Sequence, residues 1–391
     1  MGVLSSESRS LDRSVIHAML TATCPDSPLG RRPLVAPFLA INDRRESRRS
    51  RVRIVGLITV LVLSTALVPA QAAPASAESE GEVLENIPYA EPEPVGSRGH
   101  LLDLYLPETN GSALRPLLIV TGGSAWLGEN GKDYAAELAP FFTAAGYVVA
   151  GVSIRASWNA TFPAQVHDIK AAIRWLRTNA ADFGIDPDRI GIMGTSSGGW
   201  AATMAGVTRD VAELEGDVGV TGVSSRVDAV VDLYGPTDFL QMDQHMIDCA
   251  GFNERFGLGN CHNDPSSPES RLVGCAIQSC VDAVRSANPI SYVDSGAPPI
   301  LIAHGQADRL VPHHQSKLLY AALREACAEA VFYSVPEVGH DSGIVAPDVP
   351  GADTSRTDRC RERHLAGQQG ERPSLQNIEK FLHVALSRAR R

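Results

Sequence analysis

The chain has 391 residues, of which 44% are hydrophobic and 20% are charged, as in an ordinary globular protein. This composition excludes a fibrous or wholly disordered chain and supplies enough apolar residues for one large core. The formal net charge is −10; residues 1–77 hold ten Arg and five acidic residues, which leaves 25 basic and 40 acidic residues and a net charge of −15 beyond them. So acidic a chain is not expected to bind nucleic acid or an anionic membrane.

The first 77 residues have the order of an export leader. Four arginines between positions 48 and 53 precede the apolar run 54–68, and small residues follow that run up to Ala77. The run is shorter than the roughly 20 residues that a helix needs to cross a bilayer. We therefore expect residues 1–77 to be a leader with a removable signal peptide, and residues 78–391 to form one catalytic domain. The mature chain is expected to be secreted, without a stable membrane anchor.

From residue 101 onward, short β-rich runs alternate with amphipathic helical segments, which is typical of a parallel sheet covered on both faces. Strands are expected at 117–120, 147–152, 190–193, 229–233, 300–303 and 331–334. Helices are expected at 133–145, 168–180 and 200–206, with a last amphipathic helix near the C-terminus. The pattern predicts an α/β fold with a mostly parallel central sheet.

Two segments interrupt the alternation. Residues 239–290 lie between the strand-like runs 229–233 and 300–303 and are rich in Asn, Gly, Ser and Cys. They are either a surface excursion held by disulfides or a lid that faces the substrate, and the sequence leaves both open. Residues 346–373 are expected to form a second loop before the last helix.

The cysteine pattern favours disulfides over a metal site. Six of the seven cysteines follow residue 77, namely Cys249, Cys261, Cys275, Cys280, Cys327 and Cys360. An even number in an exported chain predicts disulfides, whose pairing the sequence leaves open. His262 adjoins one of these cysteines, but no CxxC pair occurs, so no metal is expected.

A serine nucleophile is predicted from a short glycine-rich run. A serine hydroxyl needs a base, a group that orients the base, and donors for the oxyanion. The run GTSSG at 194–198 matches the nucleophile elbow G-x-S-x-G, whose glycines permit a tight turn from strand to helix. The expected strand 190–193 leads into the run, and the expected helix 200–206 leads out. We expect Ser196 to be the nucleophile and Ser197 to offer its backbone N–H to the oxyanion.

The acid and the base are expected after two later strands. Asp308 follows the strand 300–303, and His340 follows the last strand-like run. Open α/β sheets place their sites at the carboxyl ends of the strands, and the order Ser196, Asp308, His340 fits the elbow motif. The alternative for Asp308 is a carboxylate that only caps its loop, and we interpret the nearby His304 as structural.

The turn after the strand 117–120 is the candidate for the oxyanion donors. Small residues there let backbone N–H groups approach the substrate oxygen, and the best pair is Gly123 or Ser124 together with Ser197. A plain tight turn is the alternative. Trp126 and Trp158 are expected to border the substrate pocket.

Several further segments carry a resemblance to a known family. They are LDLYLP at 102–107, FP at 162–163, DIKAAIRWL at 168–176, YGPTD at 234–238, and HG at 304–305 with Asp308 and VP at 311–312. With the elbow, they resemble α/β-hydrolase carboxylesterases of the hormone-sensitive-lipase-like and bacterial feruloyl-esterase-like groups. The resemblance covers about residues 101–340 and implies an α/β-hydrolase fold with a Cys-containing insertion after the sixth strand.

The chain departs from that family at two places. The family usually has a His before the glycines of its oxyanion turn, where this chain has Thr121 or Gly122. The change is expected to weaken the rigidity of the turn and to spare its backbone donors. The family elbow often has Asp and Ala around the serine, where this chain has Thr195 and Ser197. Since backbone groups act there, the replacement is expected to be tolerated.

The expected function is hydrolysis of carboxylic esters by a secreted serine hydrolase, through a Ser-His-Asp triad and an acyl-enzyme, without metal or other cofactor. The expected partner is an ester on a small molecule or a polysaccharide. The sequence assigns neither the acyl group nor the alcohol, and no oligomeric state. Two alternatives remain: an exopeptidase or oligopeptidase with the same triad, and a non-catalytic secreted binding protein that keeps the fold.

Overall fold

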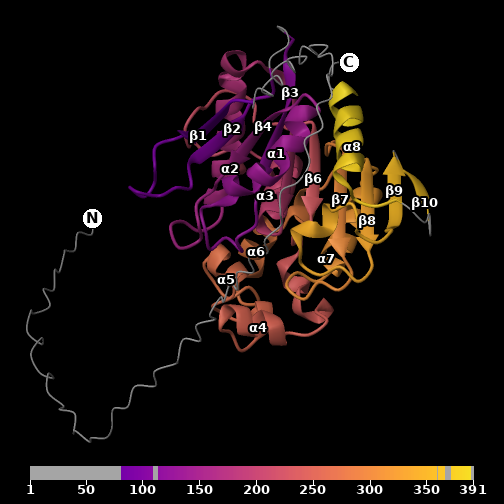
Figure 1. Ribbon diagram of the computed structural model, residues 1–391. Helices are drawn as coiled ribbons and strands as arrows, with labels where there is room; N and C mark the ends of the chain where they lie inside the picture. The colour runs from indigo at the N-terminus through magenta and orange to yellow at the C-terminus, as the bar shows by residue number, and fades with distance from the viewer. Residues whose placement is uncertain (1–80, 109–112, 359, 366–370, 389–391) are drawn as a thin grey trace, which may run out of the picture. The chain divides into compact units, whose positions relative to one another are not determined.

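The computed structural model describes residues 81–108, 113–358, 360–365 and 371–388 (Figure 1). The expected leader and its signal peptide lie outside the described residues, so this part of the domain division stays a prediction. The described residues belong to one compact unit built on a single large sheet.

The sheet has ten strands in the order β1-β2-β4-β3-β5-β6-β7-β8-β9-β10. The strands are β1 (Val83–Pro88), β2 (Leu101–Tyr105), β3 (Arg115–Thr121), β4 (Val148–Val152), β5 (Ile185–Thr195), β6 (Ala229–Leu233), β7 (Ile300–Gly305), β8 (Ala330–Val335), β9 (Asp353–Asp358) and β10 (Arg361–Leu365). Strands β3 to β8 run parallel, and the outer strands pair antiparallel. The predicted α/β fold with a mostly parallel sheet is confirmed.

Helices cover both faces of the sheet (Figure 1). They are α1 (Ala135–Ala144), α2 (Ala164–Thr178), α3 (Ser197–Val207), α7 (His314–Glu325) and α8 (Leu375–Arg388). The apolar residues of α2, α3 and α7 share one core with one face of the sheet, and those of α1 and α8 share a second core with the other face. Since both faces are covered, the central strands are apolar throughout rather than alternating. Within the described part of the chain, no helix has the length and apolarity to cross a membrane.

The second expected loop contains structure that the sequence reading missed. Within residues 346–373, β9 and β10 form an antiparallel hairpin that extends the sheet beyond β8. The strand β9 reads DTSRTD, and only Thr354 and Thr357 of it are buried. Because both faces of this strand carry polar residues, no apolar periodicity marks it. A disulfide between Cys327 and Cys360 links the hairpin to the segment that follows α7.

The insertion after the sixth strand is confirmed, and it is helical. It contains α4 (Ala250–Phe256), α5 (Pro268–Val273) and α6 (Val281–Ala287). Two disulfides hold it internally, Cys249 to Cys261 and Cys275 to Cys280. Asn288 closes its base, because its side-chain amide donates to Asp238 Oδ1 at 2.9 Å and its Oδ1 accepts from the Phe239 N–H at 3.1 Å.

Candidate active site

The elbow residue Ser196 lies between the end of β5 and the start of α3. Its backbone has φ 53° and ψ −124°, a conformation that is strained for a residue with a Cβ atom. The flanking glycines are required by space. A Cβ on Gly194 would lie 2.1 Å from the carbonyl oxygen of Gly198, and one on Gly198 would lie 2.2 Å from that of Thr121. The G-x-S-x-G pattern is therefore the steric condition for this turn.

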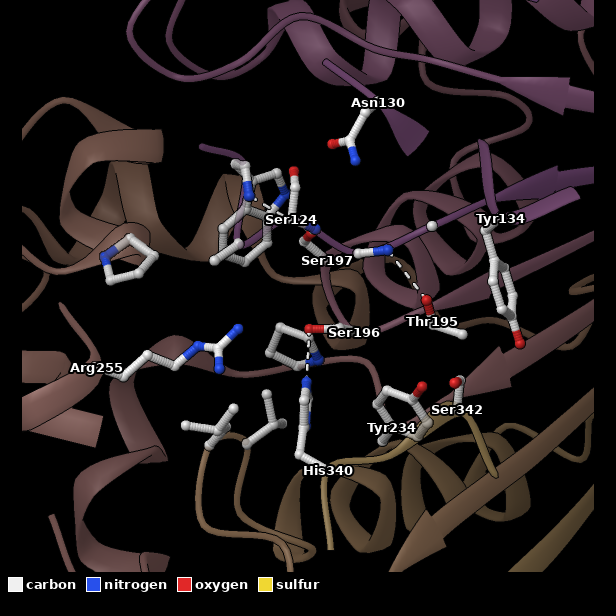
Figure 2. A pocket seen from close by; sticks show the side chains of 18 of the residues that line it. Ser124, Asn130, Tyr134, Thr195, Ser196, Ser197, Tyr234, Arg255, His340 and Ser342 are labelled. Carbon is white, nitrogen blue, oxygen red and sulfur yellow. Dashed lines mark hydrogen bonds between the residues drawn. The ribbon is translucent and has the colours of Figure 1, made fainter. Parts of the chain in front are cut away.

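The structure brings the three residues of the predicted triad together. His340 Nε2 lies 3.0 Å from Ser196 Oγ, and His340 Nδ1 lies 2.7 Å from Asp308 Oδ2. Figure 2 shows His340 directed at Ser196. The three residues follow β5, β7 and β8, so each stands at the carboxyl end of a parallel strand. This line of hydrogen bonds is the arrangement in which imidazole removes a proton from a serine hydroxyl.

Asp308 is fully buried and charged. Burial opposes its ionised form, but hydrogen bonds from His304 and His340 outweigh this effect and hold the pKa of Asp308 well below its ordinary value. Its Oδ1 also accepts from the backbone N–H groups of Leu310 and Val311, at 2.8 and 2.9 Å. The carboxylate is thus fixed in position and in charge state. These contacts do cap the loop, as the alternative reading supposed, while Oδ2 remains bonded to His340.

His304, interpreted from the sequence as structural, contacts the acid directly. Its Nε2 lies 3.1 Å from Asp308 Oδ2, and its Nδ1 lies 2.8 Å from Ser316 Oγ. The side chain is fully buried at the end of β7. His304 therefore contacts the same carboxylate oxygen as His340 and helps to hold Asp308 in place.

The oxyanion turn is held by the two residues that flank Ser196. The Gly123 N–H donates to Thr195 Oγ1 at 3.0 Å, and the Ser124 N–H donates to Ser197 Oγ at 2.9 Å (Figure 2). The structure thus places Gly123, Ser124 and Ser197 beside the nucleophile, but the N–H groups of Gly123 and Ser124, which the sequence analysis expected to face the oxyanion, donate to these two hydroxyls instead. The N–H of Ser197, at the first position of α3, has no acceptor within its own helix.

A cleft of about 470 Å³ opens above Ser196 and His340. One wall is made by Asn130, Asp133, Tyr134 and Glu137, close to the oxyanion turn. The opposite wall comes from the insertion, through residues of α4 and the start of α5. The sequence left open whether the insertion is a surface excursion held by disulfides or a segment that faces the substrate. In the structure it is held by disulfides and also forms a wall of the cleft.

The two tryptophans expected at the pocket are placed differently. Trp126 lines the cleft but is only 3% exposed, since its ring packs against Trp200 and Phe239 at centroid distances of 5.4 and 5.6 Å. Trp158 does not line the cleft. It is 67% exposed, and its Nε1 donates to the carbonyl oxygen of Leu127 at 3.2 Å. The wall expected from Trp158 is supplied by the insertion instead.

Three residues that line the cleft each have one buried side-chain atom without a hydrogen-bond partner among the described residues. These atoms are Trp126 Nε1, Tyr134 Oη and Glu269 Oε2. Burial raises the pKa of Tyr134, so its hydroxyl keeps its proton. Sequence reasoning missed Tyr134 and Glu269 because no motif or spacing distinguishes them.

Comparisons with known proteins agree with this fold. The BD-FAE family model matches residues 102–323. Esterase LipQ of Mycobacterium tuberculosis is 31% identical over 263 residues, which cover 67% of this chain and 58% of LipQ. The chain spans about half the length of the curated relatives that it matches.

Two solved structures are also similar. A truncated form of a carbohydrate esterase from gut microbiota is 38% identical, with a TM-score of 0.58, and the match covers 68% of this chain and 91% of that one. A bifunctional GH43-CE protein of Bacteroides eggerthii is 36% identical, with a TM-score of 0.58, and covers 66% of this chain and 33% of its own.

Proposed function

The chain belongs to the BD-FAE family, and on this premise we propose that it is a serine carboxylesterase. The resemblance to α/β-hydrolase carboxylesterases is thereby confirmed. The observation that carries the proposal is the hydrogen-bonded line from Ser196 through His340 to Asp308 at the floor of the cleft. An inert protein of the same fold would have no need for a strained serine aligned with a base.

The reaction takes two steps. His340 removes the hydroxyl proton of Ser196 while Oγ attacks the ester carbonyl, and the backbone N–H of Ser197 stabilises the negative charge on the carbonyl oxygen. The protonated imidazole then gives its proton to the departing alcohol, which leaves an acyl group on Ser196. Water, deprotonated by His340, attacks the acyl-enzyme and releases the acid. Asp308 orients the imidazole and stabilises its charged form throughout.

We propose that the alcohol is a carbohydrate. The cleft is lined by polar side chains, among them Asn130, Asp133 and Glu137, of the kind that form hydrogen bonds with the hydroxyl groups of a sugar. Two similar structures are described as a carbohydrate esterase and as a GH43-CE protein, which favours the same class. A secreted protein would meet such polymers outside the cell, and the export leader proposed for residues 1–77 fits this role.

The central test is the Ser196→Ala variant of the full chain, assayed with p-nitrophenyl acetate and with acetylated xylo-oligosaccharides. We expect the variant to lose at least about 10³-fold in kcat and to escape labelling by a fluorophosphonate probe. Ser291→Ala, at an exposed position outside the cleft, should keep full activity. Retained hydrolysis by Ser196→Ala would overturn the proposal. Turnover of aminoacyl p-nitroanilides in preference to esters would favour the peptidase alternative.

Export is tested separately. The full chain is produced in a bacterial host, and the N-terminus of the protein recovered from the medium is sequenced. We expect it to begin near residue 78. A chain that stays in the cells with residues 1–77 attached would contradict the leader.

A further inference from the structure

The helix α4 of the insertion directs one face into the cleft. Phe252, Arg255 and Phe256 all line the cleft, and their spacing of three and four residues puts them on the same side of the helix. Figure 2 shows the guanidinium group of Arg255 extending from the insertion wall toward Ser196. A positive charge thus faces the proposed nucleophile across the space that a substrate would fill.

Arg255 has no ion pair or hydrogen bond to any described residue. Its guanidinium carbon lies 5.8 Å from the centroid of the Phe256 ring. Other arginines of this region are engaged: Arg285 pairs with Asp282 at 3.5 Å, and Arg271 donates to the carbonyl oxygen of Ser266 at 2.9 Å. A free guanidinium on the cleft wall is therefore available to a ligand.

The helix that carries Arg255 is fixed in place. The disulfide between Cys249 and Cys261 joins the residue before α4 to the segment after it, and Asn253 Oδ1 accepts from the Cys261 N–H at 2.8 Å. Arg309, next to the triad acid, forms an ion pair with Asp248 just before the helix. Because α4 is anchored to the triad loop and to its own insertion, the position of the Arg255 backbone is set before substrate binds.

Of the Asp, Glu, Lys and Arg side chains that line the cleft, only that of Arg255 would attract an anionic group. The acidic residues Asp133 and Glu137 lie on the wall across the cleft. Lys132 Nζ lies 3.4 Å from Asp133 Oδ1 and forms an ion pair with it. On the insertion wall, the carboxylate of Glu269 is 3% exposed and forms no ion pair with Arg255. A negatively charged substrate group would be repelled by the far wall and attracted by the near one, which gives the substrate a direction.

We propose that Arg255 binds a carboxylate of the substrate, so that the cleft takes esters of acidic carbohydrates such as uronate-containing saccharides. Arginine suits this role because its planar fork donates two parallel hydrogen bonds to one carboxylate. Phe256, which is partly exposed in the cleft beside the guanidinium, offers an apolar face for a sugar ring, while Phe252 is buried against Phe256 and His262. The inference rests on the proposed esterase function and names the substrate class of the same cleft.

The test compares three esters with the full chain. They are an acetylated methyl glucoside, the methyl glucuronide acetylated at the same position, and the hemisuccinate of the methyl glucoside. The first is neutral, the second has its carboxylate on the alcohol, and the third has it on the acyl group. We expect kcat/KM for the methyl glucuronide ester to exceed that of the neutral ester by about tenfold, mainly through KM, as for a charge-assisted hydrogen bond at a partly exposed site. The preference should fall at high salt.

Matched variants assign the preference to Arg255. Arg255→Gln should abolish it and leave the neutral ester within about twofold of the wild type, while Arg255→Lys should keep part of it. Arg285→Gln removes the same charge from the exposed helix α6 of the same insertion and should keep the full preference. A preference for the hemisuccinate instead would place the carboxylate on the acyl group and overturn the proposal of an acidic carbohydrate.

Two negative results can be told apart. If the wild type hydrolyses all three esters equally, or Arg255→Gln slows all three equally, the role of Arg255 is overturned and the esterase function stands. If the wild type hydrolyses none of them and none of the simple aryl esters, the proposed function itself fails.

Discussion

Thr195 Oγ1 accepts a hydrogen bond from the backbone N–H of Gly123 at 3.0 Å, which ties the residue before the proposed nucleophile to the oxyanion turn. On the other side of Ser196, Ser197 Oγ accepts from Ser124 in the same way. The sequence analysis expected weaker rigidity in a turn without the usual His. The two hydroxyl groups supply that rigidity from the elbow instead.

Replacement of Thr195 by Val should therefore lower kcat. Val keeps the shape of the side chain but cannot accept the Gly123 N–H, so the turn loses one of its two ties. We expect about a tenfold loss in kcat with KM nearly unchanged, less than the 10²–10³-fold loss on removal of a direct oxyanion donor. Thr195→Ser keeps the hydroxyl and should retain most of the activity. An equal loss in both variants would contradict the positioning role.

The acidic limb of the pH profile should reflect a single proton. Because the pKa of Asp308 is held well below its ordinary value, this carboxylate stays ionised at every pH used in an assay. A single proton on the catalytic base is then enough to stop the reaction, and kcat/KM should fall about tenfold for each pH unit on that limb. Stopped assays in a constant-ionic-strength buffer series measure the slope. A limb with a slope near two would show that Asp308 or another group titrates as well.

Loss of the disulfide beside α4 should affect substrate binding. The Cys249→Ser/Cys261→Ser double variant frees a loop of sequence separation 12, at a cost of about 3 kcal/mol. Since α4 lines the cleft, we expect KM to rise severalfold with little change in kcat. Cys327→Ser/Cys360→Ser, whose disulfide lies at the β9–β10 hairpin, should lower the melting temperature and leave KM unchanged. An unchanged KM in the first variant would show that α4 holds its place without the disulfide.

Stability should fall in mild acid because of His313. Burial, with the nearby charges of His304 and Lys317, lowers the pKa of His313 to about 3, against 6.5 for an ordinary His. Between these values the unfolded chain binds a proton that the folded chain refuses, so stability is complete above pH 6.5 and is lost as pH falls. The loss from this group amounts to at most about 2 kcal/mol by pH 5.

The His313→Gln variant tests this linkage. The free energy of unfolding, measured by urea denaturation at pH 7 and pH 5, should change less with pH in the variant than in the wild type. His383→Gln, at an exposed position of α8, is the control and should keep the dependence of the wild type. The comparison concerns the change with pH, so a general destabilisation by the substitution does not affect it.

Much of the fold could be predicted because its central strands are apolar on both faces. The expected strand 229–233 coincides with β6, and the alternation of strands and helices identified the parallel sheet. The hairpin of β9 and β10 could not be predicted, since its polar strand pairs at an edge. Pairing partners distant in sequence, rather than local composition, determine such a strand.

The triad geometry followed from the order of three residues at strand ends, but the walls of the cleft did not. Trp158 was expected there, yet it does not line the cleft. Arg255 carried no signal in the sequence, since a single arginine on a short helix resembles any solvated charge. Its position depends on how the insertion folds back over the sheet, which the disulfide and Asn288 determine.

Asn288 bonds to both Asp238 and Phe239, so the insertion begins and ends at one point. Ser196, Asp308 and His340 stand on other loops, and a change within the insertion leaves their strands in place. Relatives can therefore diverge in substrate range by exchanging this one segment while they inherit the same reaction. A chimaera that receives residues 239–287 from a homologue would adopt the substrate selectivity of the donor and keep the catalytic triad of the recipient.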